Sequence, residues 1–118
     1  MTKVTYYTTA QGENPTRKFI ESLQKKQQRK VIRILTYIQQ YGLVTAIPHI
    51  KKLAGHPLWE IRMLGRDNIR IFYASILTDS ILLLHGFIKK SQNTPQREID
   101  TALTRLREWL TDETVIDN

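Results

Sequence analysis

The alternation of apolar and polar residues in the middle of the chain predicts β-structure. In residues 58–64, Trp59, Ile61 and Met63 alternate with charged residues, which is the period of a strand with one buried face. Because side chains two residues apart share a face of a strand, the three apolar residues are expected on the core side.

Turn residues divide the rest of this region into two further strands. Gly65 to Asn68 tolerates turn geometry, so residues 69–75 are expected to fold back as the second arm of a hairpin. A second turn, at residues 78–80, precedes residues 81–88, a nearly unbroken apolar run rich in branched side chains. Such a run suits a central strand that is covered on both faces.

Helical periodicity precedes this region. Asn14 and Pro15 are typical of a helix start, and a short first helix with one apolar face follows them. Residues 25–28 are either the connection to a second helix or its polar first turn. The second helix has apolar residues at helical spacing and is expected to end at Gly42.

The remaining segments lie between or beyond these elements. Residues 4–9 are β-branched and aromatic and predict a first strand, whereas residues 43–50 contain Pro48 and no clear period and indicate a loop that can include a turn of helix. A third helix is predicted after Pro95, and residues 114–118 are expected to fray. Its apolar residues follow the helical period: Ile99, Ala102, Leu103, Leu106, Trp109 and Leu110.

The order of strand, two helices, three strands and helix predicts an α+β fold. We expect a small, mainly antiparallel sheet of about four strands, packed with two N-terminal helices and one C-terminal helix. The length of 118 residues suits a single domain over residues 1–118.

The charge of the chain is basic and unevenly distributed. Residues 1–94 hold 15 Lys and Arg against five Asp and Glu, and residues 95–118 hold three against six, which gives +10 and −3 and the formal net charge of +7. A basic body suggests an anionic partner such as RNA, DNA or an acidic protein segment. The alternative is that the charge only keeps a small protein soluble.

Composition also bears on the compartment. The chain has no cysteine, which excludes disulfides and cysteine-based zinc sites and fits a reducing cytosol. The N-terminus lacks the apolar core of a signal peptide, and the longest apolar run is far shorter than a membrane span. We therefore expect a cytoplasmic protein that does not enter a membrane.

Arginines on neighbouring strands are the first candidates for chemistry. Arg70 lies across the predicted hairpin from Arg62, and two arginines that meet in a sheet repel each other unless an anion lies between them. Glu60 is expected on the same face as Arg62. The simpler interpretation is a set of surface charges in which Glu60 pairs with Arg62.

Lysines stand at both ends of the predicted sheet. Lys51 and Lys52 precede it, and Lys89 and Lys90 follow it. Taken one by one, each of these lysines is more simply a surface charge. Together with the arginines they would form a concave site for phosphate, where cations could stabilise charge on a phosphorane. The histidines are not spaced as a ligand set and the carboxylates do not cluster near them, so neither a metal nor another cofactor is expected.

Three segments of the chain resemble a known protein family. They are LWEIRM at residues 58–63, NIRIFYA at residues 68–74 and LLHGFIKKSQNTPQREIDTALTRL at residues 83–106. These segments are similar to the phage-derived, HigB-like branch of the RelE/ParE toxin superfamily, the toxin half of bacterial toxin–antitoxin pairs. The resemblance covers essentially the whole chain.

The resemblance implies a RelE-like fold and a ribosome-dependent mRNA endonuclease, or mRNA interferase. Relatives cut messenger RNA in the ribosomal A site without a metal, through attack of the RNA's own 2′-hydroxyl on the scissile phosphate. The resemblance also implies a cognate antitoxin, which in such pairs is often a helix-turn-helix protein similar to HigA.

The resemblance assigns roles to the candidate residues. Arg70 and Lys90 match basic residues for transition-state charge, and Arg62 matches a basic residue for phosphate binding. Glu60 is either a general base or only an ion-pair partner, and His85 is either an acid or base or a hydrogen-bonded core histidine. The residues expected to contact RNA are Lys51, Lys52, Lys89 and Tyr73, although Tyr73 also suits the core.

The sequence is also compatible with two other functions. One is a toxin similar to ParE, which inhibits DNA gyrase on a similar scaffold. The other is a nucleic-acid-binding, phage-derived protein that kept the fold and lost the chemistry.

Overall fold

The computed structural model describes residues 1–63 and 68–116, with side chains up to residue 112, and contains five strands and four helices in this part of the chain. The elements in chain order are β1 (Lys3–Tyr6), α1 (Pro15–Ser22), α2 (Lys25–Tyr41), the 3₁₀ helix η1 (Leu43–His49), β2 (Ile50–Leu53), β3 (Leu58–Arg62), β4 (Ile69–Leu77), β5 (Ser80–Ile88) and α3 (Gln96–Ile116).

The five strands form one sheet in the order β1-β5-β4-β3-β2. β1 runs parallel to β5, and the other neighbours are antiparallel. The predicted α+β class is confirmed, but the sheet has five strands instead of about four because β2 was not foreseen. β2 is a four-residue edge strand whose two lysines are exposed, so it offers no alternation long enough to be recognised.

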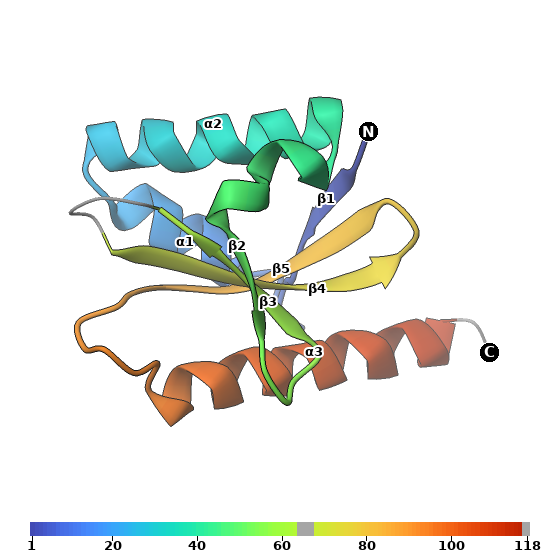
Figure 1. Cartoon of the computed structure of the whole chain (residues 1–118). Coiled ribbons are helices and arrows are strands. Elements are labelled where there is room, and N and C mark those ends of the chain that lie inside the picture. The colour runs from blue at the N-terminus through green and yellow to red at the C-terminus, as the bar shows by residue number, and fades with distance from the viewer. Residues whose placement is uncertain (64–67, 117–118) are drawn as a thin grey trace.

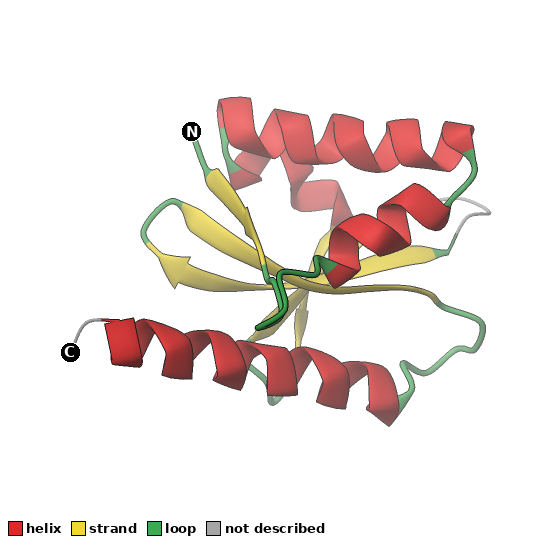
Figure 2. Cartoon of the chain, turned by 180° about the vertical axis from the view of Figure 1, so that it is seen from behind, coloured by secondary structure: helices red, strands yellow, loops and turns green. Residues whose placement is uncertain are grey.

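Helices cover both faces of the sheet, which gives the molecule three layers (Figures 1 and 2). α1, α2 and η1 lie against one face, called here the α2 face, and α3 lies against the other, the α3 face. The core of the α2 face includes Ile38, Ile61 and Tyr73. The core of the α3 face includes Leu58 and Phe72. Because β3 and β4 contribute to both cores, a charged side chain on either strand lies close to apolar surroundings.

The ends of the first two helices follow from local sequence signals. The Asn14 side chain accepts a hydrogen bond from Arg17 N at 3.0 Å and caps α1, as predicted. Residues 25–28 form the polar first turn of α2, so they are not a connection. α2 ends before Gly42, whose N–H donates to Ile38 O at 2.9 Å and whose φ of 88° suits a residue without a side chain.

β5 is buried from both sides, as its unbroken apolar sequence predicts. It lies between β1 and β4, with α1 packed on one face and α3 on the other. Phe19 of α1 packs so closely on Gly86 that a Cβ at this glycine would overlap the phenyl ring. The absence of a side chain at Gly86 therefore allows α1 to approach β5.

Turns and ends agree only partly with the prediction. Asn68 and Asp79 have positive φ values of 53° and 62°, as expected for the two turns, while residues 65–67 of the first turn lie outside the described residues. α3 continues to Ile116, so residues 114–116, which were expected to fray, are helical, and residues 117–118 lie outside the described residues. Within the described ranges, no helix is both long and apolar enough to cross a membrane.

Candidate functional site

Two arginines lie side by side on the α3 face of the sheet. The register of β3 and β4 places Arg62 directly opposite Arg70. Leu58 and Phe72 occupy alternate positions on the same two strands and belong to the core of the α3 face, so both arginine side chains leave the sheet on that face. Like charges that face each other across two strands destabilise a sheet, so this pair requires a neighbouring anion.

Glu60 supplies that negative charge from a buried position. Its Oε1 lies 2.9 Å from Arg70 Nε, and only 4% of the Glu60 side chain and 13% of the Arg70 side chain are exposed. The expected pairing of Glu60 with Arg62 is therefore wrong. The reason is cross-strand geometry: Glu60 stands opposite Phe72, which makes Arg70 its diagonal neighbour and within reach of a long side chain.

The ion pair leaves hydrogen-bonding capacity on both guanidinium groups. Arg70 Nη1 donates to its neighbour's backbone oxygen, Ile69 O, at 3.1 Å. Arg70 Nε faces Glu60 without a well-aligned hydrogen bond, and Arg62 Nε is buried without a hydrogen-bond partner among the described residues. Because a buried N–H that lacks an acceptor costs free energy, an anion with several oxygen atoms would be favoured here.

Lys51 brings a third positive charge to the same place. The register of β2 and β3 puts Lys51 opposite Glu60, and therefore on the α3 face, where its side chain is exposed. Three cations thus accompany one carboxylate, a local balance of +2. We call Lys51, Glu60, Arg62 and Arg70 the cationic cluster. Two of its members are arginines, whose guanidinium groups are well suited to bind phosphate oxygens.

Lys89 and Lys90 follow the end of β5, beside the beginning of β4. Lys89 N donates to Asn68 O at 2.8 Å, two residues before Arg70. Lys90 lines a pocket of about 400 Å³ together with the loop before α3 and the first residues of that helix. Neither arginine of the cationic cluster lines this pocket. The structure therefore brings Arg62 and Arg70 together and places Lys90 at the entrance to α3.

Lys52 and Tyr73 lie on the opposite, α2 face of the sheet. The Tyr73 ring stacks on Trp59 with centroids 6.4 Å apart, and Lys52 Nζ lies 5.7 Å from the centroid of the Trp59 ring. Tyr73 is 2% exposed, and burial raises its pKa to about 12. Of the two interpretations of Tyr73, the structure supports the core one, because an enclosed ring cannot stack on a nucleotide base. The expected RNA contact of Tyr73 is corrected accordingly.

His85 on β5 is held by two residues of α3. Its Nε2 lies 2.9 Å from Glu98 Oε1, and its Nδ1 lies 3.1 Å from Arg105 Nη1. Because arginine can only donate, Nδ1 is the acceptor and Nε2 carries the hydrogen that is donated to Glu98. Burial lowers the pKa of His85, and the charge of Arg105 acts in the same direction, against the hydrogen bond to Glu98. With both ring nitrogens engaged, His85 fits the hydrogen-bonded histidine better than a free acid or base.

The network around His85 extends along α3, and the sequence did not reveal it. Arg105 also lies over the Tyr7 ring, 5.7 Å from its centroid, and the Tyr7 hydroxyl donates to Glu108. One signal was present in the sequence. Glu98 and Arg105 are seven residues apart, so they share one side of α3, next to its apolar stripe.

The histidines lie in separate parts of the fold. His49 lines a pocket between α2 and η1, His56 follows β2, and His85 belongs to the network just described. In the part of the chain that the structure describes, no three His, Asp or Glu side chains gather into a group that could hold a metal ion.

The chain matches one protein-family model over most of its length. The model described as "Phage derived protein Gp49-like" matches residues 18–107. This range contains every member of the cationic cluster together with His85, Lys89 and Lys90. No curated protein matches the chain.

Proposed function

The chain belongs to the Gp49-like family of phage-derived proteins, part of the RelE/ParE-like superfamily of toxins, and from this premise we propose that it is a ribosome-dependent mRNA endonuclease. The family is toxin-like, and membership implies an antitoxin partner. The observation that supports a nuclease is the direct opposition of Arg62 and Arg70 around a single buried carboxylate. This arrangement leaves an excess of positive charge where a phosphate could bind.

In the proposed reaction, the 2′-hydroxyl oxygen of the RNA attacks the adjacent phosphorus. The O2′–P bond forms and the P–O5′ bond breaks, which leaves a 2′,3′-cyclic phosphate and a 5′-hydroxyl. The 2′-hydroxyl loses a proton and O5′ gains one, so no proton is consumed overall. Negative charge grows on the non-bridging oxygens as the phosphorane forms, and Arg62 and Arg70 would stabilise it by hydrogen bonds from their guanidinium groups.

The other residues of the cluster have supporting roles in this proposal. Glu60 is a positioning residue, because its ion pair with Arg70 fixes that guanidinium and its burial keeps the carboxylate away from solvent. Lys51 is exposed and is proposed to contact a neighbouring phosphate. Lys89 and Lys90, beside the start of β4, are proposed to contact the RNA on the other side of the cluster.

The partner and the place of action are proposed from the resemblance. We assign the substrate as messenger RNA in the ribosomal A site of the cytoplasm, and the partner as a helix-turn-helix antitoxin similar to HigA. A small helix-turn-helix reading frame beside the gene, whose product co-purifies with this protein, is the expected finding. A neighbour of another class would overturn the assignment of the antitoxin but not of the nuclease.

Expression in a bacterium followed by mapping of RNA 5′ ends tests the nuclease. We expect cuts within translated codons from the native protein and no cuts from Arg62→Ala. Arg62 is the suitable target because Arg70→Ala would leave Glu60 buried without its partner. Arg107→Ala, on the exposed side of α3, removes the same charge outside the cluster and should leave the cuts unchanged.

Three outcomes would overturn the proposal. If Arg62→Ala cut RNA as efficiently as the native protein, the cationic cluster would have no role in the mechanism. DNA damage that depends on gyrase, with intact messenger RNA, would indicate a toxin similar to ParE. Harmless expression without any antitoxin would indicate a protein that binds nucleic acid without cutting it.

A further inference from the structure

A second basic surface lies on the other side of the sheet from the cationic cluster. Between Glu21 and Glu60 the sequence contains no Asp or Glu and seven Lys and Arg, five of them in α2. α2, η1 and β2 all fall within this stretch, so the surface they form carries positive charge without an internal carboxylate. Arg33 has no ion-pair partner among the described residues.

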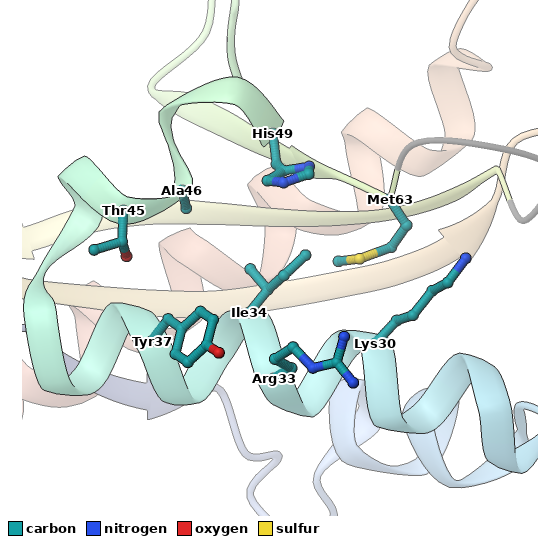
Figure 3. Close-up of a pocket in the computed structure, with 8 residues that line it drawn as sticks. All are labelled: Lys30, Arg33, Ile34, Tyr37, Thr45, Ala46, His49 and Met63. Carbon is teal, nitrogen blue, oxygen red and sulfur yellow. The ribbon is translucent and has the colours of Figure 1, made fainter.

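A pocket of about 340 Å³ opens in this surface between α2 and η1 (Figure 3). Ile34, Ala46 and Met63 form its apolar part. Lys30 and Arg33 lie along its α2 side, so that cations border an apolar hollow. This combination accepts an apolar side chain and a negative charge at the same time.

His49 adds a polar group to the wall of this pocket. Its ring reaches from η1 into the space above α2 in Figure 3. His49 Nδ1 is buried and has no hydrogen-bond partner in the described part of the chain. A buried polar atom without a partner is unfavourable, so a bound segment that turns the ring and hydrogen-bonds to Nδ1 would be stabilised there.

Large apolar side chains are exposed on the two helices that form the pocket, and one of them, Tyr37, also lines it. Tyr37 and Tyr41 of α2 are 48% and 62% exposed, and Val44 and Ile47 of η1 are 68% and 61% exposed. These four residues fall within one stretch of eleven and account for half of the eight exposed large hydrophobic residues in the described part of the chain. Clustered exposed apolar residues are typical of surfaces that bind another protein.

We infer that the pocket between α2 and η1 binds an acidic, amphipathic segment of a partner protein. An apolar side chain of the segment enters the pocket between Ile34 and Met63, and its carboxylates contact Arg33 and the other cations of α2. Charge complementarity selects an acidic partner, since α2, η1 and β2 carry seven cations between them and the connecting residues but no carboxylate. Apart from Tyr37 and His49, the uncharged lining is mainly aliphatic, which favours a protein over RNA because aliphatic groups satisfy neither phosphates nor bases.

The pocket lies on the α2 side of the sheet, whereas the arginines of the cationic cluster lie on the α3 face. A segment bound in the pocket would therefore leave Arg62 and Arg70 uncovered.

Fluorescence anisotropy with a labelled synthetic peptide tests the inference on the full-length protein. The probe is a helical peptide with Glu on one face and Leu on the other, and control peptides carry Gln for Glu or Ser for Leu. Arg33→Glu reverses a charge at the pocket, and Arg107→Glu makes the same change on α3. Thr45→Trp fills the pocket from its exposed rim, and Thr45→Ser keeps it open and retains the hydroxyl that bonds Gly42 O.

We expect the acidic peptide to bind, and Arg33→Glu and Thr45→Trp each to raise its Kd by about tenfold or more. Arg107→Glu and Thr45→Ser should leave the Kd unchanged, and both control peptides should bind more weakly. The inference would be overturned if the acidic peptide did not bind, or if Arg33→Glu and Arg107→Glu raised its Kd equally. An unchanged Kd in Thr45→Trp would also overturn it. Binding of a labelled single-stranded RNA that depends on the same two residues, without peptide binding, would assign the surface to nucleic acid instead.

Discussion

Glu60 Oε1 lies 2.9 Å from Arg70 Nε, in a contact that joins β3 to β4 and is almost completely shielded from water. The contact lies where Arg62 faces Arg70 across the same two strands. One buried carboxylate therefore reduces the repulsion between two guanidinium groups and fixes the orientation of one of them. The cationic cluster therefore contributes to the stability of the fold as well as to the proposed binding of phosphate.

Glu60→Gln should destabilise the protein strongly. The variant keeps the shape of the side chain but leaves Arg70 buried without a counter-charge, which typically costs about 3–5 kcal/mol in the free energy of unfolding. Urea denaturation followed by circular dichroism measures this loss. Lys18→Gln, which breaks the exposed ion pair of Lys18 with Glu13, should change stability far less.

Added sulfate should stabilise Glu60→Gln more than the native protein. The anion can take the place of the missing carboxylate between Arg62 and Arg70, whereas chloride at the same ionic strength only screens the charges. Melting temperatures of both proteins in the two salts provide the measurement. An equal response of variant and native protein to sulfate would contradict a cluster that binds oxyanions.

The stability of the fold should depend on the protonation of His85. Its pKa is lowered from 6.5 in the folded protein, chiefly by burial. The unfolded chain therefore binds more protons than the folded one below pH 6.5, and the free energy of unfolding decreases as the pH falls through and below that value. A urea titration at a series of pH values should show this slope. In His85→Gln the slope should be smaller, and an identical slope in both proteins would contradict the assignment.

Tyr73 should contribute to the stability of the fold and not to RNA cleavage. Because its ring is enclosed against Trp59, Tyr73→Ala should lower the free energy of unfolding by about 3–5 kcal/mol, as expected when a large buried ring is lost. Tyr73→Phe keeps the packing, and the pattern of RNA 5′ ends should be that of the native protein. Loss of RNA cleavage in Tyr73→Phe, with stability intact, would restore a direct role in RNA contact.

Gly86→Ala should separate α1 from β5. The added methyl group would overlap the ring of Phe19, and overpacking of this kind costs about 1–3 kcal/mol. Phe19→Leu in the same chain removes ring atoms at the point of overlap. The double variant should therefore lose less stability than the sum of the two single variants, which a double-mutant cycle in urea measures. Simple additivity would place the two residues out of contact.

The sequence determined the features that depend on neighbours along the chain. Asn14 and Gly42 mark helix boundaries because capping and a positive φ are properties of one or two residues. The alternation after Leu58 gave the β3–β4 hairpin, so the opposition of Arg62 and Arg70 followed from counting residues across the turn. The unbroken apolar run of β5 indicated a strand buried on both faces.

Only the tertiary structure decided which side chains meet at longer range. The sequence predicted an ion pair between Glu60 and Arg62. In the structure Glu60 lies diagonally across β3 and β4 from Arg70 and forms the ion pair with it. From the sequence alone, Tyr73 suited both the core and an RNA-binding surface. The structure shows it buried in the core of the α2 face. The physical reason is that periodicity fixes the face on which a side chain lies, whereas its partner and its burial depend on strand register and on the helix that packs above it.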